Sequence, residues 1–429
     1  MVRIIRTRRE LSLFLSELRN RSDGAGFTVT KTVEEILEDI RTNGDKALRK
    51  YTALFDRISP RSLRIPEGKI KSISKKTPPD VKRALRKSAL RIREFHKRQM
   101  EKSWRYTKDG ITLGQIIRPL RRVGVYVPGG KAAYPSTVLM NVIPAQVAGV
   151  EEIAVTVPTP GGEINPAVMT ALDILGVKEV YSVGGAQAIG ALAYGTKTIR
   201  AVDKIVGPGN IYVATAKRLV FGTVDIDMIA GPSEVLIIAD SSGDPKLIGA
   251  DLLSQAEHDE LASSILITTS TGLAKRVQKE VERQLNKLKR REIALNSLKN
   301  YGRIIIVKNL KEAVDIANII APEHLEVMTK RPESLLNSIR NAGAIFLGHW
   351  TPEPLGDYSA GPNHTLPTGG TARFFSPLGV YDFLKRSSLL SFTERGFRKI
   401  ADIVELLADT EGLEAHANTI RVRKNKSTS

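Results

Sequence analysis

Histidines and amides form the first set of residues whose spacing suits chemistry. The chain has only six histidines, and several lie close to carboxylates or amides in its second half. Gln255 and His258 are three residues apart in a segment with a helical pattern, so both side chains could reach one ion. With Asp357 and His416 they would form a nitrogen and oxygen ligand set suited to zinc or another divalent cation. Gln is a weak ligand and the acidic neighbours of His258 are better ones, so an ordinary helix surface remains the alternative interpretation.

Glu323 and His324 form a second candidate pair, in the sequence Ala-Pro-Glu-His-Leu. They follow a predicted helix that starts at Leu310, at a turn made rigid by Pro322. A carboxylate and an imidazole can each take up or release a proton near neutral pH. Adjacent side chains need not point the same way, so a surface turn with a capping carboxylate is the alternative.

A third group of side chains lies between residues 355 and 377, LGDYSAGPNHTLPTGGTARFFSP. The stretch contains Asp357, Tyr358, Asn363 and His364 among four glycines and three prolines. It is too punctuated for a helix or strand and too rich in ligand-type side chains for a simple linker. We therefore predict an ordered functional loop.

The overall composition is that of a globular protein. The chain has 429 residues, 41% of them apolar and 26% charged, which favours about two to four domains with substantial cores. Its apolar runs are far shorter than the roughly 20 residues that a membrane-spanning helix needs. The N-terminal 21 residues place acidic side chains within an amphipathic pattern, unlike a secretory signal, so we expect a cytoplasmic protein. The sequence contains no cysteine, which excludes disulfides, thiolate ligands and a cysteine nucleophile.

The basic charge raises nucleic acid as a partner. Lysines and arginines number 65 against 46 acidic residues, a formal net charge of +19. Much of the excess lies in residues 69–108, around a predicted basic helix over residues 79–103 with one apolar stripe. No nucleic-acid-binding motif accompanies it, so we predict a solvated helix face and no specific nucleic acid partner.

Strand and helix patterns alternate from Val123 onward. Strands are predicted at residues 123–127, 153–157, 180–183 and 204–206, and then at 235–240, 265–268, 304–307 and 344–347, with helical patterns between most of them. Strand, helix, strand at this spacing indicates parallel sheets covered on both faces. The predicted fold class is α/β, with two doubly wound, incomplete Rossmann-like parallel-sheet domains and smaller helical segments at the N- and C-terminal ends.

Glycine-rich turns follow three strands of the first series, at residues 128–130, 184–187 and 207–210. Open parallel sheets bind ligands at the carboxyl ends of their strands, and glycine lets the backbone approach a pyrophosphate closely. None of these turns has the full G-x-G-x-x-G spacing, so plain tight turns remain an alternative to nucleotide binding.

The motifs, taken together, resemble those of the histidinol dehydrogenase family. They read VGVYVPGG, STVLMNVIPAQVAGV, GGAQAIGALAYGT, GPGNIYVATAKR, AGPSEVLIIAD, DLLSQAEHDELA, APEHLE, LGDYSAGPNHTLPTGG and EGLEAHANTIRVR. The resemblance extends from about Val33 to Arg421, and so many long motifs in one order are very specific.

This resemblance implies a zinc-dependent homodimer that oxidises L-histidinol to L-histidine through histidinaldehyde with two NAD⁺, in histidine biosynthesis. It implies zinc ligands Gln255, His258, Asp357 and His416, and catalytic residues Glu323 and His324. It implies a substrate site of Ser233, Gln255, His258, His324, Asp357, His364, Glu411 and His416, and nucleotide contacts from Tyr126, Gln187 and Asn210. In this family the C-terminal segment reaches the partner subunit, so His416 and Glu411 are expected to complete the neighbour's site.

The expected domains follow from the patterns and the resemblance together. They are an N-terminal helical segment (1–30), the helical part of the first α/β domain (31–122), a nucleotide-binding α/β domain (123–232), a second α/β domain with the metal and catalytic residues (233–380), and a C-terminal helical segment that reaches the partner subunit (381–429).

Chemistry from the residues agrees with these implied roles. His324 can take the hydroxyl proton as hydride leaves an alcohol. Oxidation of the aldehyde needs an oxygen nucleophile, and because the chain has no cysteine, water must add, with Glu323 as the residue to activate it. A related NAD-dependent dehydrogenase of another polar alcohol is the alternative function, and nucleic-acid binding is the non-enzyme alternative.

Overall fold

The computed structural model describes residues 2–22, 26–59, 62–129 and 134–425. The chain divides into two compact units, one formed by Met1–Gln99 with Leu120–Phe383 and the other by Met100–Pro119 with Leu384–Ser429. The sequence predictions at Gly130 fall outside the described residues. No helix formed by the described residues is both long enough and apolar enough to cross a membrane.

The first sheet of the larger unit has five parallel strands in the order β6-β5-β4-β7-β8. They are β4 (Arg122–Tyr126), β5 (Glu152–Thr156), β6 (Glu179–Tyr181), β7 (Lys204–Val206) and β8 (Asp225–Ile226). Its helices are α2 (Phe27–Asn43), α3 (Asp45–Asp56), α4 (Glu67–Ser74), α5 (Pro79–Lys97), α6 (Pro135–Ala148), α7 (Pro166–Ile174), α8 (Gly185–Tyr194) and α9 (Ile211–Val220), with a short 3₁₀ turn η1 (Pro160–Gly162). From β4 the chain adds β5 and β6 on one side, and then β7 and β8 on the other side of β4. Right-handed crossovers therefore place α6 and α7 on one face of the sheet and α8 and α9 on the other.

The core of this sheet includes the apolar face of α2, whose residues recur at helical spacing in the sequence. Val33, Ile36, Leu37 and Ile40 are buried in one cluster with residues of α8 and α9. The helix begins at Phe27, earlier than its apolar pattern suggests, and it ends at Gly44, whose φ of 50° suits glycine.

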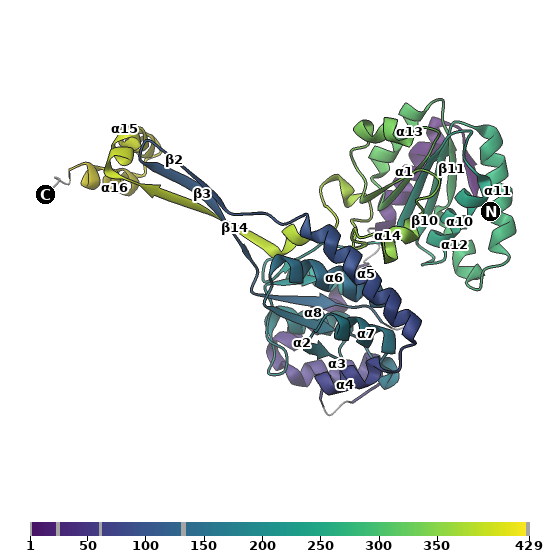
Figure 1. Cartoon of the computed structure of the whole chain (residues 1–429), viewed down its shortest axis with the longest axis horizontal. Helices are drawn as coiled ribbons and strands as arrows, with labels where there is room; N and C mark the ends of the chain where they lie inside the picture. Colours follow the sequence, from purple (N-terminus) through teal and green to yellow (C-terminus); the bar gives the residue numbers. More distant parts are fainter. Residues whose placement is uncertain (1, 23–25, 60–61, 130–133, 426–429) are drawn as a thin grey trace. The chain divides into compact units, whose positions relative to one another are not determined.

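The second sheet has six parallel strands in the order β1-β11-β10-β9-β12-β13. They are β1 (Arg3–Ile5), β9 (Glu234–Ala239), β10 (Ser263–Thr268), β11 (Arg303–Ile306), β12 (His324–Met328) and β13 (Ala344–Leu347). One face is covered by α10 (Pro245–Ala256), α11 (Thr271–Leu285) and α12 (Arg291–Tyr301), and the other by α1 (Arg8–Ser22) and α13 (Leu310–Ile320) (Figure 1). Further short elements are α14 (Glu353–Tyr358), η2 (Pro332–Ser338), η3 (Thr371–Arg373) and η4 (Val380–Phe383).

Two doubly wound parallel sheets confirm the predicted fold class. The sequence patterns missed β12, because the run His-Leu-Glu-Val-Met carries a charged residue at its centre. Glu326 is nevertheless buried in this strand, where it accepts a hydrogen bond from the backbone N–H of Glu353 at 2.8 Å. They also missed β1, which is an edge strand of this sheet and pairs with β11.

The smaller unit differs from the prediction of helices alone. Residues predicted as part of a helical section form β2 (Trp104–Lys108) and β3 (Ile111–Pro119), and residues after Tyr381 form β14 (Leu384–Phe392). The three strands make an antiparallel sheet in the order β14-β3-β2. Asp109 and Gly110, with φ of 55° and 81°, join β2 and β3; an Asp-Gly pair of this kind is a strong hairpin signal in sequence. Helices α15 (Glu394–Thr410) and α16 (Glu414–Lys424) complete the unit.

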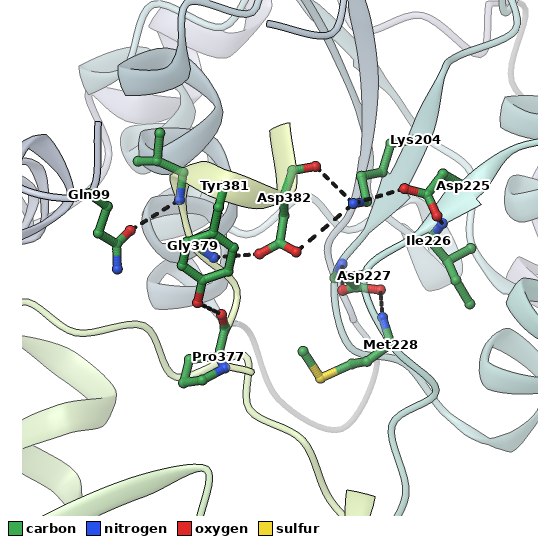
Figure 2. A network of polar contacts seen from close by, with 12 residues as sticks. Gln99, Lys204, Asp225, Ile226, Asp227, Met228, Pro377, Gly379, Tyr381 and Asp382 are labelled. Carbon is green, nitrogen blue, oxygen red and sulfur yellow. Dashed lines mark hydrogen bonds and ion pairs between the residues drawn. The ribbon is translucent and has the colours of Figure 1, made fainter. Parts of the chain in front are cut away.

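Polar contacts fix the parts of the larger unit from which the chain continues into the smaller one (Figure 2). Lys204 of β7 donates to the backbone carbonyl of Asp382 at 2.8 Å and pairs with Asp225 at 2.9 Å. The amide oxygen of Gln99 accepts the backbone N–H of Val380 at 3.0 Å. The segment around η4 is therefore anchored to the first sheet by a nearly buried ammonium group.

Candidate active site

His324 is the first residue of β12 and is buried beside the start of β9. Its Nδ1 lies 2.9 Å from the backbone carbonyl of Glu234. A carbonyl only accepts, so Nδ1 carries the hydrogen and the lone pair of a neutral ring lies on Nε2. Within the described part of the chain Nε2 is buried without a hydrogen-bond partner, 3.7 Å from Oδ1 of Asp357. The ring is thus held in one tautomer, with its basic nitrogen facing a carboxylate.

Glu323 is buried directly beside this imidazole. Its Oε2 accepts the backbone N–H of Glu234 at 2.9 Å and lies 3.7 Å from Nδ1 of His324. Burial raises the pKa of Glu323 to about 8, although the charge of His324 opposes this shift. Burial alone would lower the pKa of His324, but the negative charge of Glu323 and the contact with Asp357 raise it to about 10. The two adjacent side chains therefore share one environment and influence each other's protonation.

Asp357 lies on the short helix α14, so the prediction of a loop is wrong for its first residues. Pro352 precedes the helix and Pro354 lies in its first turn, where a missing N–H costs nothing. Burial raises the pKa of Asp357, but the interaction with His324 lowers it overall. His364 lies beyond the helix, and its Nδ1 is 3.0 Å from the backbone carbonyl of Asp357. This contact joins His364 to the backbone of Asp357.

Three side chains form a cluster that could hold a metal ion. Ligand atoms of His258, Glu353 and Asp357 all lie within 4.8 Å of one another. Sequence reasoning missed Glu353, which is buried and four residues before Asp357 on the same helix. An i, i+4 pair of carboxylates on one helix face would have identified it if the segment had been recognised as helical.

Gln255 lies in the last turn of α10, and His258 follows the end of that helix. The Gln255 side chain is fully buried, and neither its amide oxygen nor its amide nitrogen has a hydrogen-bond partner among the described residues. A buried, unpaired amide is costly, and a cation would satisfy its oxygen. The donor set of amide, imidazole and carboxylate groups therefore fits a divalent metal such as zinc.

A cavity of about 320 Å³ lies beside His324 and Asp357. His324, Asp357 and His364 contribute to its lining. Apolar side chains form much of the remaining wall: Phe95, Phe346, Leu355, Leu366 and Leu378. This volume and mixed lining suit a small polar molecule with a flat or apolar part.

The remaining candidates of the substrate site are divided between the two units. Ser233 immediately precedes Glu234 and β9 in the larger unit. Glu411 is the C-cap of α15 and His416 lies in the first turn of α16, both in the smaller unit.

The three candidate nucleotide contacts all lie at carboxyl ends of strands in the first sheet, or in the turns that follow. Tyr126 ends β4, and its hydroxyl accepts the backbone N–H of Gly185 at 3.2 Å. Gln187 lies in the first turn of α8, fully buried, and its amide has no partner in the part of the chain that the structure describes. Asn210 is the N-cap of α9, where its Oδ1 accepts the N–H groups of Tyr212 and Val213.

Gly207 shows why one of these turns needs glycine. Its φ is 115°, and a Cβ at this position would lie 2.1 Å from the carbonyl oxygen of Tyr126. The turn therefore packs closely against the end of β4. With the unpaired amide of Gln187 nearby in the fold, this edge fits a nucleotide as its ligand.

Comparison with known proteins places this geometry in a family. The sequence model of one family, described as histidinol dehydrogenase, matches residues 19–424. The chain belongs to the histidinol dehydrogenase family. It is 58% identical over 397 residues to histidinol dehydrogenase from Aquifex aeolicus, with 92% of each chain covered. It is 52% identical over 412 residues to the family member from Clostridium acetobutylicum, with 96% of each covered.

A solved structure of the family shows the same fold. The crystal structure of histidinol dehydrogenase from Elizabethkingia anophelis matches with a TM-score of 0.93 and 37% sequence identity, and 98% of each chain is covered. The family match includes all the candidate site residues of both units. The resemblance inferred from the motifs is confirmed.

Proposed function

We propose that this protein oxidises L-histidinol to L-histidine through histidinaldehyde with two NAD⁺, as a zinc-dependent enzyme of histidine biosynthesis in the cytoplasm. The observation that carries the proposal is His324, with Nδ1 fixed on a carbonyl and Nε2 buried, unpaired and facing Asp357. Family membership supplies the substrate. In this proposal residues 123–232 form the nucleotide-binding domain, and residues 233–380 form the domain with the metal and catalytic residues.

The residues that would hold zinc are Gln255, His258 and Asp357, with His416 from a second copy of the chain. The unpaired amide of Gln255 and the close approach of His258 and Asp357 support this set. When bound, zinc would fix the amino and imidazole nitrogens of the substrate and so orient its reactive carbon. Ser233, His364 and Glu411 would line the same substrate site.

The nucleotide would lie at the carboxyl edge of the first sheet. Tyr126, Gln187 and Asn210 would contact it, and NAD⁺ supplies the hydride acceptor for each oxidation. Burial raises the pKa of Tyr126 to about 12. Its phenol therefore stays neutral and can donate its hydrogen to a ligand while it accepts from Gly185.

In the first oxidation, His324 in its neutral form takes the hydroxyl proton at Nε2 as hydride leaves the carbinol carbon. With zinc bound, the charge of Asp357, which helps to raise the pKa of His324, would be offset. The alcohol loses two electrons and two hydrogens, one as hydride and one as the proton on His324. The bond from Nδ1 to the Glu234 carbonyl keeps the lone pair of the neutral ring on Nε2 until the proton arrives there. The carboxylates of Asp357 and Glu323 then stabilise the imidazolium that forms.

In the second oxidation, water adds to the aldehyde. Glu323 takes a proton from the attacking water, which leaves the hydrate as an anion. This anion passes a second hydride to NAD⁺ and loses its remaining hydroxyl proton to give the carboxylate. The pKa of about 8 suits a group that alternates between base and acid near neutral pH. The absence of cysteine leaves no thiol to take this nucleophilic role.

A homodimer with shared sites completes the proposal. Apolar side chains of α15 in the smaller unit are strongly exposed, among them Leu406 at 67% and Ile403 at 59%. Such a surface favours burial against a second copy. Glu411 and His416 lie at the end of this helix and at the start of the next, so the partner's segment would bring them to the site.

The deciding experiment measures NADH formed per histidinol consumed by the purified protein, together with its zinc content. We expect two NADH per histidinol and zinc in a fixed ratio to protein. One NADH per alcohol would contradict the four-electron reaction and indicate the related dehydrogenase of another polar alcohol. Full activity without metal would contradict the zinc assignment.

A further inference from the structure

Glu234, the first residue of β9, contacts both proposed catalytic residues through three separate groups. Its backbone N–H donates to Oε2 of Glu323 at 2.9 Å, and its own Oε2 accepts the backbone N–H of Glu323 at 3.3 Å. Its carbonyl accepts from Nδ1 of His324 at 2.9 Å. Main-chain and side-chain atoms of one residue thus hold Glu323 at two points and His324 at one.

These contacts take the place of regular backbone hydrogen bonds at the start of β9 and β12. β9 and β12 pair in parallel, with Val235 opposite His324. Glu323 precedes the pairing, and its N–H is taken by a carboxylate where a backbone carbonyl would ordinarily serve. The reciprocal bond from the Glu234 N–H fixes the carboxylate of Glu323 in turn. The orientation of the proposed water-activating group therefore depends on the Glu234 side chain.

Two buried carboxylates side by side require a counter-charge. Arg21 of α1, 213 residues from Glu234 in sequence, forms a buried ion pair with Oε1 of Glu234. Its guanidinium also donates to the carbonyl of Leu261 at 2.9 Å and lies over the ring of Tyr301, 5.4 Å from its centroid. Arg21 is therefore held in place by three groups, and it offsets the charge of Glu234 next to Glu323.

We propose that Glu234 is a positioning residue that orients Glu323 for the second oxidation, and that Arg21 of the N-terminal helix acts through it. The inference rests on the proposed function for its chemistry, and it predicts a step-specific effect. Removal of Arg21 leaves Glu234 as an uncompensated buried charge, which then turns away from Glu323 or takes up a proton. The backbone carbonyl that holds His324 is unaffected, so the first oxidation is less sensitive than the second.

The chain offers a matched control for Arg21. Arg303 of β11 is also a buried arginine that binds α1, through an ion pair with Glu17 at 3.1 Å. It also stacks on an aromatic ring, that of Phe14, at 4.7 Å. None of its hydrogen bonds or ion pairs among the described residues involves Glu234, Glu323 or His324. Arg303→Met therefore tests the loss of a buried arginine at the same helix without the proposed link to the site.

The experiment compares Arg21→Met, Arg21→Lys, Glu234→Gln, the double variant Arg21→Met/Glu234→Gln, and Arg303→Met as zinc-loaded protein. Rates are measured with supplied histidinol and with supplied histidinaldehyde, beside zinc content and melting temperature. We expect Arg21→Met to lower kcat for aldehyde oxidation by about tenfold or more with KM and zinc content nearly unchanged. Arg21→Lys and the double variant recover part of that loss, because charge balance is restored in each.

Equal effects of Arg21→Met and Arg303→Met on aldehyde kcat, or losses that follow melting temperature or zinc content, would overturn the inference. A crystal structure of Arg21→Met gives a test that does not depend on activity. We expect Oε2 of Glu323 to move out of hydrogen-bond reach of the Glu234 N–H, and an unmoved carboxylate would refute the positioning role. If the unmodified protein formed no NADH from histidinol, the proposed function would fail by itself, and the structural test would still decide the positioning.

Discussion

The two parallel sheets of the larger unit place their candidate residues at opposite edges. The first sheet has Tyr126 at the end of β4 and glycine turns beyond the ends of β6 and β7. In the second sheet, His324 begins β12 and Glu234 begins β9. The helix α10 returns toward the start of β9, so Gln255 in its last turn reaches the same amino edge.

The chemical character of the two edges differs as well. The carboxyl edge of the first sheet offers backbone groups, a neutral phenol and amides. Such groups suit a cofactor that is bound and released with its covalent skeleton unchanged. The amino edge of the second sheet collects buried carboxylates and imidazoles whose pKa values burial and mutual charge have shifted. Under the proposed function, the common rule that open sheets bind ligands at the carboxyl ends of their strands holds for the first sheet alone. The following variants test this division, from the largest expected effect to the smallest.

Glu323→Gln tests the amino edge directly. An amide cannot take a proton from water, so we expect the second oxidation to fall by about 10²–10⁴-fold while the first is much less affected. Rates of NADH formation with supplied histidinol and supplied histidinaldehyde give the comparison. Equal losses of both steps would assign Glu323 to substrate binding or structure.

His416→Asn tests whether the amino edge needs a second chain. Loss of a metal ligand should reduce activity by at least about a hundredfold, since even the loss of a residue that only supports a ligand costs 10–100-fold. The dimer should remain folded. Mixing this variant with Glu323→Gln should restore a fraction of the activity, because one site of each mixed dimer would have both residues intact. No recovery in mixed dimers would show that each site belongs to one chain.

Glu353→Gln tests the carboxylate that sequence patterns missed. We expect zinc affinity to fall by about 10–100-fold, because the buried group lies within the cluster of His258 and Asp357. Competition with a chelator measures this directly. Glu257→Gln, at the residue before His258, is the matched control and should leave zinc affinity unchanged. Equal zinc retention by both variants would remove Glu353 from the metal site.

Gln187→Leu tests the other edge. The buried amide has no protein partner in the described residues, so its loss should raise the KM for NAD⁺ by about tenfold and leave zinc affinity unchanged. Steady-state kinetics with varied NAD⁺ and a zinc titration separate the two edges. A change in zinc affinity would show that the edges are not independent.

Local patterns predicted the parts of the fold that depend on neighbours in sequence. Four strands of the first sheet follow from periodicity, and their bounds differ from the predictions by two residues at most. The two-residue strand β8 was missed, because so short a strand shows no periodicity. The hairpin at Asp109 and Gly110 also had a local signal, the Asp-Gly pair itself. The strand β12 had none, because the buried Glu326 depends on distant groups, among them the N–H of Glu353.

The candidate site was predictable in its residue types but not in its linkages. Histidines and carboxylates are candidates by their chemistry alone, and the family resemblance implied their roles. The approach of His258 to the carboxylates of α14, and the pairing of Arg21 with Glu234, depend on contacts between distant segments. Such contacts leave no spacing in the sequence, since only the folded sheet brings the segments together.

The pairing of β1 with β11 bears on how the protein forms during synthesis. Arg3 lies opposite Arg303, and Arg21 reaches Glu234, so early segments of the chain find their partners only after most of the chain has been made. Contacts of such long range are slow to form, and exposed strand edges invite association meanwhile. During synthesis, the first sheet can assemble from residues 122–226 before the partners of residues 3–21 have been made. Completion of the second sheet would then be the late event that makes the enzyme competent.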